Sequence, residues 1–231
     1  SFADLLDPRF KEIFDNDYTQ LPDMIDKFYR MVSGKLSTER FSQVGAMGAM
    51  SQFTGTVDYG DVSQGYDIAV TPIEFTKGIQ VERILWENDQ SDIINNKPKA
   101  LADVVYLLRQ THRVRPFSNA FSVDTFFYNN TEAVALCSNS HTTTTGASTA
   151  TGFDNYVTTA LSATSVAAAR IQMLKHRNDQ AQEISVQPTT LYIPIDLYEQ
   201  AYEITASSGK VDQATNNANV HKGKYEVIED I

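Results

Sequence analysis

Two stretches decide the fold: YGDVSQGYDIAVTPIEFTKGIQVERILWENDQ, residues 59–90, and KALADVVYLLRQTHRV, residues 99–114. In the first stretch, apolar and polar residues alternate over 66–70 and again over 79–83, which is the period of half-exposed strands. In the second stretch, apolar residues recur at helical spacing. The sequence therefore predicts a two-stranded β-ribbon that leads into a long helix.

The predicted ribbon needs another surface to lie on. An isolated two-stranded ribbon is marginal in water, and this one has only a modest apolar face beside its polar face. We therefore expect it to rest on a neighbouring copy of the chain, which favours a shell-forming subunit over an enzyme. The residues predicted to contact that copy are Tyr66, Ile68, Lys77, Ile79, Glu82 and Arg83.

Composition excludes several classes of protein. The 231 residues are 42% hydrophobic, enough for one core or two smaller ones. A formal net charge of -10 argues against binding nucleic acid through a basic surface, and it would keep the protein from adhering to DNA held beside it. The single cysteine, Cys137, excludes an intrachain disulfide and suits a reducing cytoplasm. No apolar run has the length of a membrane span, so we expect no membrane partner.

The segments before the long helix, and the helix itself, have recognisable starts and ends. Asp7 followed by Pro8 predicts a helix N-cap within an N-terminal arm. Four glycines between residues 45 and 60 predict a flexible lead-in to the ribbon. The long helix should end at Pro116. Its predicted buried stripe consists of Leu101, Val104, Val105 and Leu108.

The C-terminal half alternates between β and helical patterns around a polar loop. The predicted elements, in order, are an aromatic β segment over 117–137, the polar loop over 138–152, a helix from Ser162, a strand over 186–193 and a helix from Pro194. The polar loop is low in complexity and is predicted to be a linker. A last strand is predicted over 224–228, and the sequence shows no evident partner for it.

The order of these elements resembles the plan of tailed-phage major capsid proteins, and most closely the Mu-like major head subunit family. The resemblance covers most of the chain in the same order, although each piece is a soft pattern without a catalytic signature. The segments that carry it are GYDIAVTPIEFTKGIQVERILWEND (65–89), NAFSVDTFFYN (119–129), ALCSNSHTTTTG (135–146), ALSATSVAAARIQML (160–174), QPTTLYIPIDLYEQAYEI (187–204) and NNANVHKGKYEV (216–227).

This resemblance implies an α+β, Hong Kong 97-type phage capsid fold. Its parts would be an N-terminal arm with the glycine-rich lead-in (1–56), an extended β-hairpin loop (57–83), the spine helix with the peripheral domain (84–160) and the axial domain (161–231). Members of the family normally continue past the turn at NVHKG to finish the axial domain. We therefore expect the axial domain to be incomplete in this sequence.

The function implied is that of a major capsid (head) protein of a tailed double-stranded DNA bacteriophage. Copies would assemble into hexamers and pentamers of an icosahedral shell that encloses the genome without sequence-specific binding. The resemblance also implies a place in the virion, assembly in the bacterial cytoplasm, and portal, scaffold and decoration proteins as partners. An alternative with the same fold is the shell subunit of an encapsulin-like nanocompartment, which encloses a cargo enzyme. Particle size and nucleic-acid content distinguish the two.

No catalytic, cofactor-binding or metal-binding residue is predicted. The sequence contains no GxxxxGK phosphate loop, no GxGxxG, no HExxH and no GxSxG. Cys137 and His141 are close enough in sequence to suggest a thiol nucleophile with a base. Without an evident third group to orient the base, we interpret them as a small buried cysteine and a polar loop histidine.

Some capsids of this fold join their subunits by an isopeptide bond between a lysine and an asparagine. Lys77 in the predicted ribbon is the suitable lysine, and the partners in the sequence would be Asn216, Asn217 and Asn219. Such a bond also needs a carboxylate in an apolar pocket, which the sequence does not identify. We therefore expect Lys77 to be a surface lysine.

Overall fold

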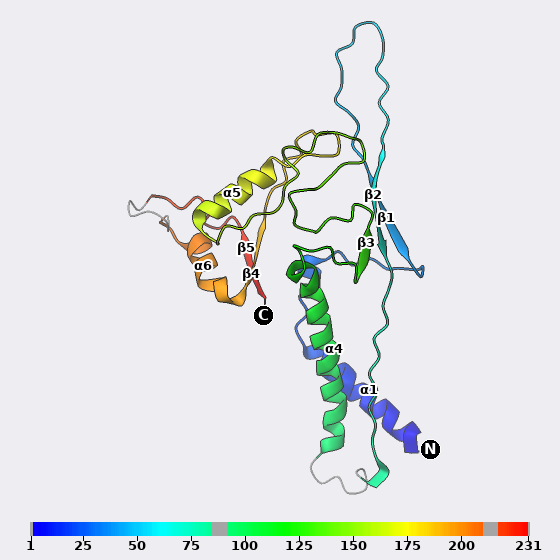
Figure 1. Cartoon of the computed structure of the whole chain (residues 1–231). Helices are drawn as coiled ribbons and strands as arrows, with labels where there is room; N and C mark the ends of the chain where they lie inside the picture. Colours follow the sequence, from blue (N-terminus) through cyan, green and yellow to red (C-terminus); the bar gives the residue numbers. More distant parts are fainter. Residues whose placement is uncertain (1, 85–91, 210–216, 231) are drawn as a thin grey trace. The chain divides into compact units, whose positions relative to one another are not determined.

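The chain forms two compact units in the computed structural model (Figure 1). The structure describes residues 2–84, 92–209 and 217–230. The first unit consists of Ser1–Glu39 and Thr71–Asn119, and the second consists of Arg40–Val70 and Ala120–Ile231. The backbone therefore leaves the first unit, enters the second, returns, and enters the second again.

The first unit is built on the packing of helix α1 (Phe2–Gln20) against helix α4 (Ile93–Ser118). A short helix, α2 (Ile25–Phe28), follows α1. The Arg109 guanidinium of α4 contacts the Tyr18 hydroxyl of α1 and lies 2.6 Å from Asp23 Oδ2. These contacts attach the C-terminal end of α1, and the segment that follows it, to α4.

Aromatic side chains at the end of α2 and just after it attach this segment to the C-terminal end of α4. The Tyr29 hydroxyl donates a hydrogen bond to the Arg113 carbonyl at 2.6 Å. The Arg113 guanidinium lies 5.5 Å from the centre of the Phe28 ring, which packs edge-on against Phe117 at 5.9 Å. A cation over an aromatic face is an electrostatic attraction, so Arg113 can be buried there.

Three predictions for this unit are wrong in detail. Helix α1 begins at Phe2, so Asp7 is not its N-cap and Pro8 lies inside it, and α4 continues past Pro116. A proline removes one backbone hydrogen bond, a local loss that packing between α1 and α4 can offset. Of the predicted buried stripe, Leu101, Val105 and Leu108 are half-buried, but Val104 is 46% exposed. The buried residues of α4 are Ile94, Pro98, Ala102 and Arg113.

The second unit contains a sheet in the order β1 (Glu39–Val44), β2 (Gln64–Val70) and β3 (Tyr128–Asn130). β2 and β3 are antiparallel, with Ile68 opposite Asn130. The strand predicted over 66–70 is thus confirmed as β2.

The pairing predicted for that strand is wrong. Residues 71–82, all of them described, contain no strand, so the second half of the predicted ribbon over 79–83 does not exist as a β element. The alternating pattern gives the period of an extended chain, but only the neighbouring backbone decides whether it pairs. β2 pairs instead with β1 and β3. The predicted division of the chain into the parts 1–56, 57–83, 84–160 and 161–231 stays a prediction.

The rest of the second unit packs two helices against a parallel pair of strands. Helix α5 (Ala163–Leu174) has Ser162 as its N-cap, whose hydroxyl accepts the Ser165 backbone N–H at 3.0 Å, and this start was predicted. A 3₁₀ turn, η1 (Ile195–Leu197), leads into helix α6 (Tyr198–Ala206), close to the predicted start at Pro194. Ala163, Val166 and Ile204 form the buried cluster.

The C-terminal strand has a partner that the sequence did not reveal. β4 (Thr190–Pro194) and β5 (Glu226–Asp230) run parallel, with Leu191 opposite Val227. Parallel strands need a long crossover, here through η1 and α6, so the two partners lie more than thirty residues apart. A local pattern cannot show such a pairing.

Ile204→Ala should destabilise the second unit. Ile204 is 1% exposed within the α5–α6 cluster, and truncation of a buried isoleucine leaves a cavity. We expect the free energy of unfolding to fall by about 2–5 kcal/mol in urea denaturation of the full chain. Ile195→Ala, at a side chain that is 54% exposed, is the matched control and should change it by less than about 0.5 kcal/mol. Equal losses in both variants would contradict the assigned core.

Candidate subunit-contact surfaces

The described residues bury few large apolar side chains. Among the described residues, ten apolar side chains are buried when Pro98 is included, and four of these are alanines. Much of the apolar side-chain area therefore remains available for contacts with other molecules.

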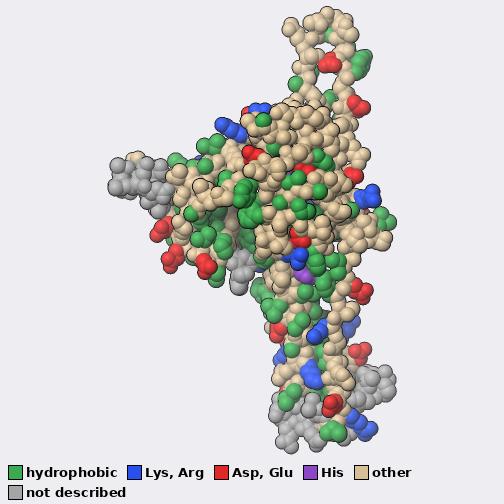
Figure 2. All heavy atoms as spheres, in the orientation of Figure 1, with side chains coloured by type: hydrophobic (Ala, Val, Ile, Leu, Met, Phe, Trp, Pro, Cys, Tyr) green, Lys and Arg blue, Asp and Glu red, His purple; other side chains and the backbone are tan. Residues whose placement is uncertain are grey.

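Six of the exposed large apolar side chains lie in the loop over residues 45–63, which we call the contact loop. It connects β1 to β2 and extends beyond the two strands in Figure 1. Met50 is 99% exposed and Tyr59 is 89% exposed. The other large apolar side chains exposed along it are Met47, Phe53, Val57 and Val62, and Figure 2 shows hydrophobic side chains on this loop.

The contact loop is acidic as well as apolar. It contains Asp58 and Asp61 and no lysine or arginine. The Ser51 hydroxyl donates to Asp58 Oδ2 at 3.1 Å, which joins the two arms of the loop near its tip. Gly55, with φ +108°, allows the turn there. Exposed apolar patches are characteristic of interaction sites, and the charge of this loop would favour a partner surface that is neutral or basic.

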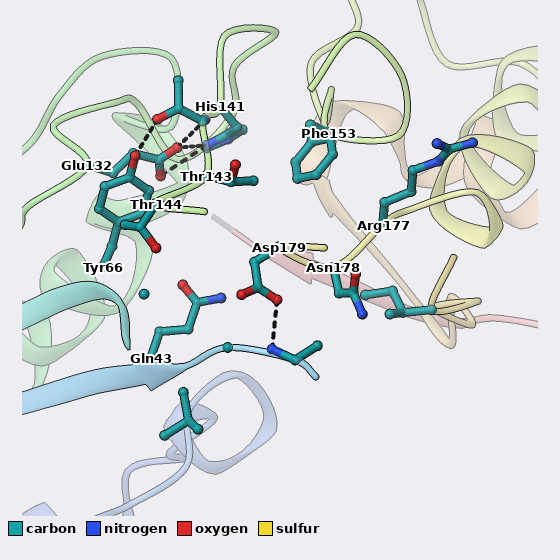
Figure 3. A pocket seen from close by; sticks show the side chains of 16 residues that line it. Gln43, Tyr66, Glu132, His141, Thr143, Thr144, Phe153, Arg177, Asn178 and Asp179 are labelled. Atoms are coloured by element: carbon teal, nitrogen blue, oxygen red, sulfur yellow. Dashed lines mark hydrogen bonds and ion pairs between the residues drawn. The ribbon is translucent and has the colours of Figure 1, made fainter. Parts of the chain in front are cut away.

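The base of the contact loop adjoins a pocket of about 400 Å³ (Figure 3). Its walls include residues of β2 together with the polar loop 138–152 and the segment 177–184. The Tyr66 hydroxyl is 2.6 Å from Thr142 Oγ1, and the Thr144 hydroxyl donates to the Gln64 carbonyl at 3.0 Å. The polar loop was predicted to be a linker, and this is wrong, because its threonines fasten it to β2.

A second cluster of polar side chains, around Glu132, lines the same pocket. Glu132 accepts the Thr142 backbone N–H at 2.8 Å and lies 3.1 Å from His141 Nδ1. The Thr145 hydroxyl donates to the carbonyl of Asp179. These bonds satisfy polar groups of an irregular segment that no sheet or helix satisfies. The pocket is therefore a structural junction under the contact loop.

The six residues predicted to contact a neighbour do not lie on one ribbon. Tyr66 and Ile68 belong to β2 in the second unit; Tyr66 is half-buried and bonded to Thr142, whereas Ile68 is exposed. The first unit contains the other four in a segment without strands: Lys77, Ile79, Glu82 and Arg83. Their contact with a neighbouring copy stays a prediction. Sequence reasoning missed the contact loop because its glycines suggested a flexible lead-in, although its recurring methionines and aromatics were a visible signal.

Burial argues against a thiol nucleophile at Cys137. Glu132 does face His141 Nδ1 and is the orienting group that the sequence did not reveal. Burial nevertheless raises the pKa of the Cys137 thiol, which disfavours the reactive thiolate. Within the described ranges, no group of three or more histidine, cysteine or acidic side chains could hold a metal ion. Over those same ranges, no helix is long and apolar enough to cross a membrane.

Asn219 is committed to a structural role. Its Nδ2 donates to the carbonyls of Ile204 at 2.7 Å and Ser207 at 3.0 Å, at the end of α6. Its Oδ1 accepts the His221 backbone N–H at 2.9 Å. An isopeptide bond from Lys77 to this amide would disrupt these hydrogen bonds. Of the other two predicted partners, Asn217 is exposed and Asn216 lies outside the described residues.

The fold is that of a phage capsid protein. A chain from the procapsid of bacteriophage JBD30 matches with a TM-score of 0.55 and 14% sequence identity, over 99% of this chain and 98% of that chain. At this identity the likeness establishes the fold. No curated protein sequence matches the chain.

Sequence comparison identifies the family. The profile of the family described as Mu-like prophage major head subunit gpT matches residues 104–230, more than half of the chain. The chain therefore belongs to the Mu-like prophage major head subunit gpT family. The predicted resemblance, the capsid fold and the function as a phage major capsid protein are confirmed. Neither comparison supports the encapsulin alternative.

Cys137 should label slowly with iodoacetamide at pH 7 while the chain is folded. Burial raises the pKa of its thiol, so little thiolate is present to react. Mass spectrometry of the labelled fraction over time should show a several-fold faster reaction in urea. A folded chain that reacts faster than the unfolded one would restore the nucleophile hypothesis.

Proposed function

We propose that the contact loop rests on a neighbouring copy and supplies part of the cohesion of a phage head shell. Capsid assembly from many copies follows from family membership. The observation that supports a role for the contact loop is its run of exposed apolar side chains, with Met50 almost fully in solvent. Within this proposal, β1, the contact loop and β2 take the place of the extended hairpin predicted over 57–83.

Each contact of this kind is weak by itself. Burial of Met50, Phe53 and Tyr59 on a neighbour would contribute about 1.5–3 kcal/mol for each side chain. Association of two chains costs about 4–15 kcal/mol in lost rotational and translational freedom. One loop contact therefore roughly balances the cost of association, and a closed shell forms because every copy makes several contacts at once.

The shell we propose is icosahedral, is built from hexamers and pentamers, and encloses double-stranded DNA. The formal net charge of -10 supports enclosure without sequence-specific binding, because an acidic subunit repels the DNA backbone. Assembly in the bacterial cytoplasm and contacts with portal, scaffold and decoration proteins belong to the same proposal. So does the absence of enzymatic activity, which suits a structural head subunit.

The double variant Met50→Asp with Phe53→Asp should fold but fail to close shells. Charged side chains at these positions cannot be buried on a neighbour without a large desolvation cost. Negative-stain electron microscopy and particle mass should show free subunits or small oligomers where the unaltered chain forms shells.

The matched control is Gln52→Asp, which adds an acid to the same exposed loop without removing apolar surface. It should assemble normally. Normal shells from the double variant would disprove the role of the contact loop. Nucleic acid recovered from the shells tests the enclosure of DNA.

A further inference from the structure

We propose that Asp179 is the positioning residue that sets the direction of the contact loop. This inference rests on the proposed role of that loop in assembly. Asp179 lies 133 positions away in sequence, yet its Oδ1 accepts the backbone N–H of Ala46 at 2.8 Å (Figure 3). Ala46 is the second residue of the loop, so the bond holds the loop where it leaves β1. A hydrogen bond to an ionised carboxylate is stronger than one between neutral groups.

Asp179 is itself held by a tight turn. Asn178 Oδ1 accepts the backbone N–H groups of Gln180 at 3.1 Å and Gln182 at 2.9 Å. The Asp179 carbonyl accepts the Thr145 hydroxyl. These bonds fix the backbone on both sides of the carboxylate. The loop is therefore anchored to a defined point in the second unit.

Gly45 makes this anchoring possible. Its N–H donates to the Ser63 carbonyl at 2.8 Å, which joins the two ends of the contact loop. A Cβ added at Gly45 would overlap Asp179 Oδ2 and lie 2.7 Å from the Ser63 carbonyl oxygen. Because one of these atoms belongs to the backbone, a side chain at this position would force the loop base to move.

Among the described residues, the Asp179 carboxylate accepts a hydrogen bond only through Oδ1. In the part of the chain that the structure describes, Asp179 Oδ2 is buried and has no hydrogen-bond partner. Burial of a charged group is costly unless it gains an interaction. The interaction it gains is the bond to Ala46, so the geometry of the loop base is what this side chain supports.

A small change at the base produces a large change at the tip. Gly55 lies nine residues beyond Ala46, and an extended chain of this length reaches at most about 30 Å. A rotation of about 10° at the base would then displace the tip by up to about 5 Å. Van der Waals contacts are lost over less than 1 Å, so Met50 and Phe53 would miss a surface to which they fit.

Asp179→Ala should loosen the loop base and reduce assembly. Hydrogen–deuterium exchange on the unassembled full chain should be several-fold faster in peptides that contain Ala46, with exchange in α5 and α6 unchanged. Electron microscopy should show few closed shells. Asp179→Asn keeps an accepting oxygen but loses the charge, so both measurements should fall between those of the unaltered chain and of Asp179→Ala. Asp154→Ala, at an exposed carboxylate, is the control and should alter neither measurement.

Gly45→Ala tests the same base without altering Asp179, should the aspartate variant fail to fold. It should also speed exchange around Ala46 and reduce the number of shells. Gly48→Ala is its matched control, because a Cβ added there meets no atom within 4 Å, and it should assemble normally.

The outcomes separate this inference from the proposed function. Unchanged exchange around Ala46 in Asp179→Ala, or faster exchange with normal shells, would overturn the positioning role of Asp179. Neither result depends on the variants at Met50 and Phe53, which test the contact loop directly. Faster exchange and fewer shells in both Asp179→Ala and Gly45→Ala, with normal controls, would support the inference.

Discussion

The shortage of internal burial is the constraint on which this structure depends. Folding must offset a conformational entropy cost that grows with every ordered residue, yet few apolar side chains are buried among the described residues, and many of those are small. Large apolar side chains such as Met50 and Phe53 stay in solvent. Exposed apolar surface of this kind is available for burial against other copies, which agrees with membership of a major head subunit family.

Side-chain hydrogen bonds to the backbone replace the missing core in the irregular parts. Thr144 bonds to β2, Asn219 bonds to the end of α6, and Asp179 bonds to the base of the contact loop. Such bonds satisfy backbone groups that lie outside helices and sheets. They bury little surface, so they can define the geometry of a segment that leaves its apolar side chains exposed for a partner.

Local signals in the sequence predicted local structure well. Ser162 caps α5 because its hydroxyl reaches an N–H only three residues away. The period of β2 and the start of α6 near Pro194 were also visible. Long-range pairing was not visible, since β2 joins β1 and β3 instead of the segment over 79–83. The contact loop was missed for a different reason, because its glycines were interpreted as a flexible lead-in although its methionines and aromatics were visible in the sequence.

The sequence by itself determined the family, the order of most elements, and the acidic charge that disfavours binding to nucleic acid. These properties depend on residue type and on spacing over a few positions, where the backbone geometry is regular. Only the tertiary structure decided that β5 pairs with β4 and that Asp179 reaches Ala46. Contacts of this kind join residues far apart in the chain, and their free energy exists only once folding has brought them together.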